Sequence, residues 1–136
     1  MIKQVIIIRK DLRMRRGKEI AQGAHASMKW LTQRMKRPMH MVDDEKWTYP
    51  REYSVRFSKP EEDWIKGLFT KITLQVNSEE ELVVIHNAAQ EAGIISEIIE
   101  DAGMTEFAGV KTKTAVAIGP DRAEKIDPIT AHLKLY

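Results

Sequence analysis

The strongest constraint on the fold is a run of branched apolar residues near the start of the chain. Residues 4–8 read Gln-Val-Ile-Ile-Ile, and β-branched side chains favour strands. Because apolar residues occupy successive positions, the run predicts a strand that is buried on both faces. We therefore expect a central strand of an α/β sheet.

A dense basic segment follows this strand directly. Residues 9–18 contain six Lys or Arg and one Asp, and Gly17 separates them from a helical pattern. Cations this close together repel one another unless an anion approaches. The segment also lies between a strand and a helix, where α/β sheets bind ligands and where helix N-termini favour phosphate. The sequence therefore predicts a polyanionic partner, contacted first by Arg13, Arg15, Arg16 and Lys18.

The helix after Gly17 has two distinct faces. Helical spacing gathers an apolar stripe on one face and a polar row on the other. The stripe comprises Ile20, Ala24, Met28, Leu31 and Met35, and the row comprises Lys18, Gln22, His25 and Lys29. A polar helix face is often only solvated surface. The neighbouring basic segment favours the alternative, in which the row forms hydrogen bonds with a ligand.

The remaining chain continues to alternate strands and helices. Residues 70–76, 96–99 and 114–118 have strand patterns, and helices are predicted near 60–67, 78–93 and 120–129. Residues 36–59 lack periodicity and are expected to form an irregular insertion, with weak strand-like alternation at 53–57. The prediction is one domain over residues 1–136. Its fold class is α/β, a three-layer sandwich whose mixed sheet has about four strands and helices on both faces.

Charge and composition narrow the functional classes. Residues 1–71 carry 17 Lys or Arg against 9 Asp or Glu, whereas residues 72–136 carry 5 against 11. This asymmetry predicts one basic face and one acidic face. The chain has no cysteine, which excludes disulfides, thiolate metal sites and cysteine nucleophiles. We expect a cytoplasmic protein, because the sequence has neither a signal-peptide pattern nor an apolar run near the roughly 20 residues of a membrane helix.

Four segments together resemble one known family. They are GKEIAQGAHA, KITLQV, EDAGMTEFAGVKTKTAVAIGP and IDPITAHLKLY, and they occur in this order along the chain. In order and spacing they resemble the type 2 peptidyl-tRNA hydrolases, the archaeal and eukaryotic type. The resemblance implies hydrolysis of the ester that joins a peptide to the terminal ribose of tRNA. It also implies that tRNA is the partner and that the protein is a homodimer.

The resemblance assigns roles to particular residues. Catalytic positions match Lys18, Asp101, Thr105 and Thr112, and tRNA-binding positions match Gln22 and His25, with Lys29 in the same row. The segment Val110-Lys111-Thr112 departs from the usual Pro-Gly-Thr or Pro-Gly-Ser. Alignment back from Gly119-Pro120 places the expected threonine at Thr112. The alternative register, with Gly109 as the motif glycine, would remove it.

Elementary chemistry agrees with these positions but leaves alternatives open. Ester hydrolysis needs an activated water and a group that stabilises the oxyanion. A carboxyl such as Asp101, with an ordinary pKa of about 3.9, is ionised at neutral pH and can orient a water. Lys18 could pair with Asp101 or donate to the oxyanion. Asp101 could instead only cap the turn at Ala102-Gly103, since Asp before Gly is ordinary turn chemistry.

We expect neither a cofactor nor a metal, because the sequence shows no cluster of ligands at metal-binding spacing. Two other functions remain open at this stage. One is a non-catalytic tRNA- or RNA-binding module on the same fold. The other is an esterase that acts on a different acylated nucleotide.

Overall fold

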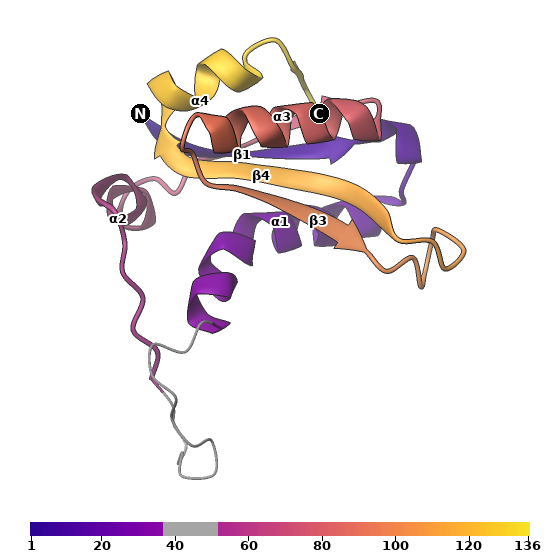
Figure 1. Ribbon diagram of the computed structural model, residues 1–136, viewed down its shortest axis with the longest axis horizontal. Coiled ribbons are helices and arrows are strands. Elements are labelled where there is room, and N and C mark those ends of the chain that lie inside the picture. Colours follow the sequence, from indigo (N-terminus) through magenta and orange to yellow (C-terminus); the bar gives the residue numbers. More distant parts are fainter. Residues whose placement is uncertain (37–51) are drawn as a thin grey trace.

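A mixed five-stranded sheet lies between two layers of helices in the computed structural model (Figure 1). The structure describes residues 1–36 and 52–136. Its elements are β1 (Ile2–Arg9), the short 3-10 helix η1 (Lys10–Leu12), α1 (Arg16–Lys36), α2 (Lys59–Lys66), β2 (Lys71–Val76), α3 (Glu79–Glu91), β3 (Ser96–Asp101), β4 (Thr112–Arg122), α4 (Ala123–Thr130) and β5 (Lys134–Leu135). The predicted α/β sandwich is confirmed, with the short β5 as an additional edge strand.

The strand order is β3-β4-β1-β2-β5, so β1 is central as predicted. It pairs in parallel with β2 and antiparallel with β4, which in turn pairs antiparallel with β3. The carboxyl ends of β1, β2 and β3 therefore lie at the same end of the sheet. Figure 1 shows the start of α1 and the loop between β3 and β4 at this same end.

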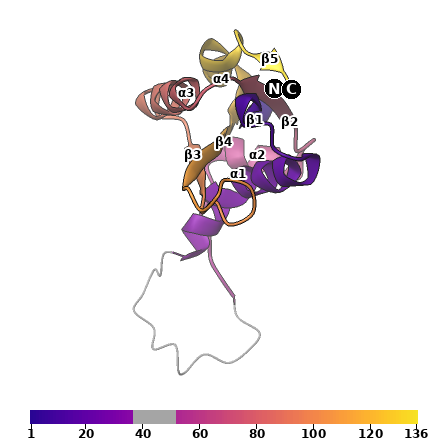
Figure 2. The same ribbon diagram turned by 90° about the vertical axis from the view of Figure 1, so that its right-hand side faces the viewer.

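The sheet has an apolar core on each face. Helices α3 and α4 cover one face, and α1 and α2 cover the other (Figure 2). Branched side chains such as Val5, Ile7 and Leu82 fill the first core. The second core is smaller and includes Ala26, Ala115 and Ala117. Small side chains allow α1 to lie close to the sheet.

Helix α1 has the predicted period but faces the sheet with its polar side. Ile20 and Met28 of the apolar stripe are 66% and 56% exposed, and Met35 is also exposed. The buried residues of the helix are Gln22, Ala26, Ser27 and Trp30. Interpreting the polar row as a solvated helix face is therefore wrong, because most of the row contacts β3 and β4.

Hydrogen bonds to the sheet make this burial of polar groups possible. The Gln22 amide donates to Thr114 Oγ1 at 2.7 Å. Ser27 Oγ donates to Gln4 Oε1 at 2.6 Å, and Gln4 Nε2 donates back to the Ser27 carbonyl at 3.0 Å. Gln4, Gln22 and Thr114 are completely or almost completely buried. Buried polar groups are tolerated when they are hydrogen-bonded in this way.

Helix α2 forms where Pro60 and Gly67 predict it. Ser58 and Glu61 complete a capping box at its start, and Trp64 packs edge-on against Trp30 of α1. Residues 52–58 have no regular structure, so the strand-like alternation at 53–57 is not a strand. The rest of the predicted insertion, from residue 37 to 51, lies outside the described residues. No described helix is long and apolar enough to cross a membrane.

Candidate active site

Three predicted catalytic side chains meet at the carboxyl end of β3. Lys18, in the first turn of α1, donates from Nζ to Asp101 Oδ1 at 2.7 Å and to Thr105 Oγ1 at 3.2 Å. The side chains of Lys18 and Asp101 are 17% and 15% exposed. They are therefore largely screened from water but still reachable from outside, as residues that act on a large substrate must be.

Asp101 makes two different contacts through its two carboxylate oxygens. Oδ1 accepts from Lys18, and Oδ2 accepts from the backbone N–H of Gly103 at 2.8 Å. Asp101 therefore caps the turn, but it does not only cap the turn, because it also pairs with Lys18. The hydrogen bond from Lys18 is the largest influence on the pKa of Asp101 and holds it below the ordinary value. The Gly103 N–H and the charges of Lys18 and His25 act in the same direction against desolvation.

Strand pairing brings Thr112 to the same site. Asp101 and Thr112 are direct partners in the antiparallel β3–β4 ladder, and side chains opposite each other in such a ladder share one face. Thr112 Oγ1 donates to the Val110 carbonyl at 2.9 Å. If Thr112 is aligned with the threonine of the family motif, the hydroxyl of that threonine lies opposite Asp101 in the ladder and on the same face of the sheet.

A bulge in β4 follows immediately. The register shifts between Ile99 and Glu100 of β3, so that Thr114 has no partner across the ladder. A bulge turns two successive side chains to the same face. Thr114 and Ala115 therefore both face α1, where Thr114 bonds Gln22 and Ala115 lies in the second core. Thr112, two residues before Thr114, lies on the same face through ordinary strand alternation.

The loop between β3 and β4 depends on a glycine at position 103. Gly103 has a φ of 80°, and a Cβ at this position would lie 2.3 Å from the Val110 carbonyl oxygen. Its own carbonyl accepts from the Gly109 N–H at 2.8 Å. Gly109 has the same φ of 80° but open space around it. The loop therefore closes tightly at Gly103, next to the N–H that holds Asp101.

Two residues of this loop were not predicted as part of the site. Glu106 accepts from Arg15 Nε at 2.8 Å, and the Phe107 ring centroid lies 6.0 Å from Lys18 Nζ. The basic segment and the β3–β4 loop are thereby joined across the site. An acidic residue in a predicted tRNA-facing loop was the available signal for Glu106. Nothing in the local sequence singles out Phe107.

The residues predicted to bind tRNA do not form one group. Lys29 bonds to the Ile98 carbonyl at 2.6 Å on β3. His25 and Arg16 are exposed. Arg13, at the end of η1, lines a cavity formed with β2 and α3.

The position of Gln22 differs from the one expected of a residue that binds tRNA directly. Its side chain is 1% exposed and bonded to Thr114, so it supports the site from beneath and does not face the solvent.

Comparison with known proteins shows which family this sequence resembles. The model of the family described as peptidyl-tRNA hydrolase PTH2 matches residues 2–136. The peptidyl-tRNA hydrolase of Methanocaldococcus jannaschii is 39% identical over 134 residues, covering 98% of this chain and 99% of the relative. That of Nanoarchaeum equitans is 40% identical over 136 residues and covers both chains completely.

Among solved structures, a protein of unknown function from Agrobacterium is similar with a TM-score of 0.56. The similarity covers 98% of this chain and 96% of that one at 15% sequence identity, and it concerns the fold alone. The family match, in contrast, extends over nearly the whole sequence, including the segments that carry Lys18, Asp101 and Thr105. The chain therefore belongs to the peptidyl-tRNA hydrolase PTH2 family.

Proposed function

We propose that the chain hydrolyses the ester of peptidyl-tRNA, releasing the peptide and free tRNA, at a site built from Lys18, Asp101, Thr105 and Thr112. The observation that carries this proposal is the hydrogen-bonded arrangement of Lys18 with Asp101 and Thr105. It combines a carboxylate, an ammonium group and a hydroxyl within reach of one substrate atom. Family membership supplies the substrate class.

The arrangement provides each group that ester hydrolysis needs. A water held by the Asp101 carboxylate attacks the ester carbonyl, and its oxygen forms the new bond to carbon. The bond from that carbon to the ribose oxygen then breaks, and the proton that the water loses passes to the ribose oxygen. Because the pKa of Asp101 is lowered, the carboxylate is a weak base that orients the water more than it removes its proton.

Lys18 serves in both of the roles that the sequence left open. An ammonium group has three protons, and hydrogen bonds to Asp101 and Thr105 use two of them. The third can donate to the oxyanion that develops on the ester carbonyl. Thr105 and Thr112 provide hydroxyls for the water or for the ribose.

The test is release of N-blocked aminoacyl group from tRNA at neutral pH, with EDTA present. Wild type is compared with Lys18→Ala and Asp101→Asn, and unblocked aminoacyl-tRNA is the second substrate. We expect the wild type to cleave the blocked substrate in EDTA. Loss of an oriented carboxylate or of an oxyanion donor should lower kcat by about 10²- to 10⁴-fold.

The same assay separates the alternatives. A non-catalytic RNA-binding module would bind tRNA without turnover, and its binding would tolerate Asp101→Asn. An esterase for another acylated nucleotide would cleave a blocked adenosine ester but would gain nothing from the tRNA. Loss of activity in EDTA, restored by a divalent cation, would contradict the proposed metal-free chemistry.

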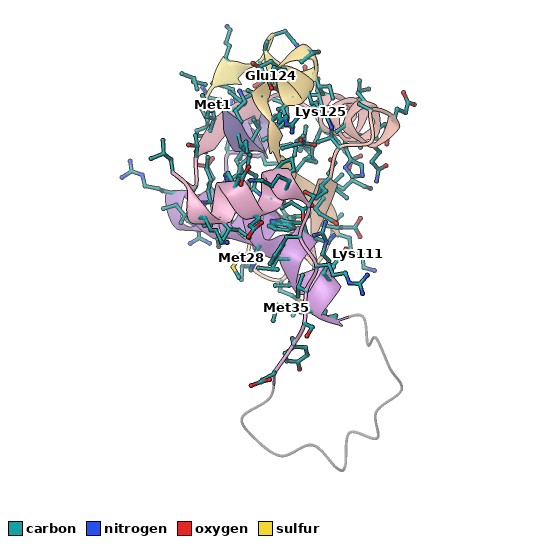
Figure 3. All side chains as sticks on the ribbon, turned by 90° about the vertical axis from the view of Figure 1, so that its left-hand side faces the viewer. Met1, Met28, Met35, Lys111, Glu124 and Lys125 are labelled. Atoms are coloured by element: carbon teal, nitrogen blue, oxygen red, sulfur yellow. The ribbon has the colours of Figure 1, made fainter. Side chains whose placement is uncertain are left out.

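We also propose a homodimer formed through the exposed stripe of α1. Ile20, Ala24, Met28 and Met35 lie on the outer side of the helix, and the stripe runs for about 22 Å at 1.5 Å per residue. Figure 3 shows Met28 and Met35 together on the α1 side of the molecule. Two such helices can cover each other about a two-fold axis.

Sedimentation equilibrium tests this arrangement. The wild type should be a dimer and Met28→Glu a monomer, whereas Val84→Glu should remain dimeric, because Val84 is 65% exposed but lies on α3. A wild type that remains monomeric at tens of micromolar would contradict it. We place the protein in the cytoplasm, where translation generates its substrate, and cell fractionation would test this location.

A further inference from the structure

A second candidate binding region lies at the same end of the sheet as Lys18 and Asp101, but on the opposite face. A cavity of about 820 Å³ opens beside η1, β2, α3 and the segment between α4 and β5. The carboxyl ends of the parallel strands β1 and β2 point toward it, which is where open α/β sheets bind ligands. The proposed ester site does not use this cavity.

The charges around the cavity are unbalanced. Lys10, Arg13 and Lys134 line it, and among the described residues none of the three forms an ion pair with a carboxylate. His132 is a further lining residue. The cavity therefore offers several cations to an anion.

The two acidic residues of the lining already have partners. Asp11 accepts from Arg9 Nε at 3.2 Å and from Arg9 Nη2 at 2.7 Å. Glu81 accepts from the Asn77 backbone N–H at 3.1 Å, at the start of α3. The charge of Asp11 is balanced by Arg9, which leaves Lys10, Arg13 and Lys134 against the single carboxylate of Glu81, a net positive lining.

The remaining lining combines apolar and amide groups. Val84, Ile85 and Leu133 provide an apolar surface, and Gln75 and Asn77 provide side-chain amides. A nucleobase has flat apolar faces and an edge of donors and acceptors, and its phosphate is an anion. The cavity thus matches the three chemical parts of a nucleotide.

The basic segment divides between this cavity and the ester site. Arg15 bonds to Glu106 beside the ester site, whereas Arg13 lines the cavity. Met14 between them is 6% exposed and belongs to the core under α1, so the segment is anchored. Arg13 has a left-handed backbone, with a φ of 50° and a ψ of 42°. That conformation is unfavourable for residues other than Gly, Asn and Asp, and such strain concentrates at functional sites.

We propose that this cavity binds one nucleotide of the tRNA acceptor arm, other than the terminal adenosine whose ester is cleaved. Lys10, Arg13 and Lys134 contact its phosphate, and its base packs against Val84 and Leu133. This inference rests on the proposed function, because the ester site defines where the tRNA 3′ end lies. The RNA would pass η1 at the end of the sheet and contact both faces of the protein.

The experiment compares two variants with a matched control. Arg13→Asn removes the guanidinium and keeps a residue that tolerates the left-handed backbone. Lys134→Gln removes one charge from the exposed strand β5. Lys125→Gln removes the same charge from α4, where Lys125 lies near Met1 (Figure 3) and does not line the cavity. Melting temperatures establish that all three fold.

Two substrates are used, N-blocked aminoacyl-tRNA and the N-blocked aminoacyl ester of adenosine, which has no second nucleotide. For the tRNA, Arg13→Asn and Lys134→Gln should each raise KM about 3- to 10-fold with kcat within twofold. Each should also reduce the slope of log KM against log salt by about 0.7 to 0.9. For the adenosine ester, both variants should match the wild type.

Three outcomes would overturn the proposal. In the first, both variants behave like Lys125→Gln with tRNA. In the second, both lose as much with the adenosine ester, which would place the cavity at the ester itself. In the third, an added mononucleotide raises the melting temperature of the wild type but not of the two variants, while KM for tRNA is unchanged in the variants. The cavity would then be a site for a free nucleotide. Failure of the proposed function is a separate result, because the wild type would then cleave neither substrate or would cleave the adenosine ester as well as the tRNA.

Discussion

At the residue scale, Asp101 both caps a turn and forms an ion pair, two contacts that the sequence analysis had considered as alternatives. One oxygen accepts the turn N–H of Gly103 and the other accepts Lys18. The Asp-x-Gly spacing predicts the first contact, because it is local. The second joins residues 83 positions apart, and only the resemblance to a known family pointed to it. The local sequence therefore predicted the turn at Gly103. The contact between Asp101 and Lys18 depends on the fold, which brings α1 next to the end of β3.

The lowered pKa of Asp101 has a consequence for activity in acid. A carboxyl whose pKa is depressed in the folded protein stays ionised below its ordinary pKa of about 3.9 and loses its stabilising pairing only as pH falls through the lower folded value. We therefore expect kcat/KM to show no loss attributable to Asp101 between pH 7 and pH 5. Lys18→Met, which removes the largest cause of the shift, should move the acid limb upward in pH. A pH–rate profile of both proteins measures this, and an acid limb that starts near pH 6 in the wild type would contradict it.

The two left-handed glycines of the β3–β4 loop provide a matched pair. Gly103→Ala would place a Cβ 2.3 Å from the Val110 carbonyl oxygen, whereas Gly109→Ala would meet nothing within 4 Å. Both substitutions incur the left-handed backbone cost of about 1 kcal/mol, but only the first displaces the loop that holds Asp101. We expect Gly103→Ala to reduce kcat by at least about 10²-fold and Gly109→Ala to lower mainly the melting temperature. Equal kcat in the two variants would show that the close approach at residue 103 is unimportant.

At the element scale, α1 shows where sequence analysis reached its limit. Its period was predicted correctly, but the face that it buries depends on Gln4 and Thr114, which belong to strands far away in sequence. A hydrophobic pattern ranks faces by apolarity and contains no information about distant hydrogen-bond partners. Strands β1, β2 and β4 were easier to predict from the sequence, because each contains a strand pattern within its own residues. The two-residue β5 has too few residues to form a pattern.

The buried position of Gln22 leads to a test of its role. Gln22→Ala should lower the free energy of unfolding by about 1–3 kcal/mol, because it leaves the Thr114 hydroxyl buried without its partner. Chemical denaturation measures this change. His25→Ala, an exposed neighbour on the same helix, should leave stability within about 0.5 kcal/mol of the wild type. A raised KM for tRNA in Gln22→Ala, with unchanged stability, would restore the direct RNA contact that the sequence suggested.

At the scale of the whole molecule, the fold converts an asymmetry along the chain into two faces. Helices α1 and α2 come from the basic half of the sequence and cover one face, and α3 and α4 come from the acidic half and cover the other (Figure 2). A net charge of +2 conceals this separation. The α/β class, the mixed sheet and the central position of β1 were predicted, because alternating elements permit few arrangements and the residues of β1 are apolar on both faces. The cavity beside η1 was not, because four separate segments form it.

The basic face predicts a salt dependence that the net charge does not. If Arg13, Arg15 and Arg16 contact phosphates together with Lys10 and Lys134 of the cavity, log KM for tRNA should rise with log salt with a slope of about 4, from five contacts at about 0.7 to 0.9 each. Steady-state kinetics between 50 and 200 mM salt would measure it. The N-blocked ester of adenosine is the control and should show almost no dependence. A flat response with tRNA would refute the phosphate contacts.

The reversed orientation of α1 also affects how this stretch of sequence can change over generations. Positions 18, 22 and 26 face the proposed ester site, the sheet or the core, whereas 20, 24, 28 and 35 face outward. In a library of all single substitutions, growth selection should accept the exchange of one apolar residue for another at the outward positions and reject apolar residues at positions 18 and 22. The tolerance profile would oscillate with a helical period in phase with hydrophobicity, the reverse of the usual pattern for a helix with a buried apolar face. A statistical predictor trained to equate apolar with buried would misjudge this helix at most of these positions.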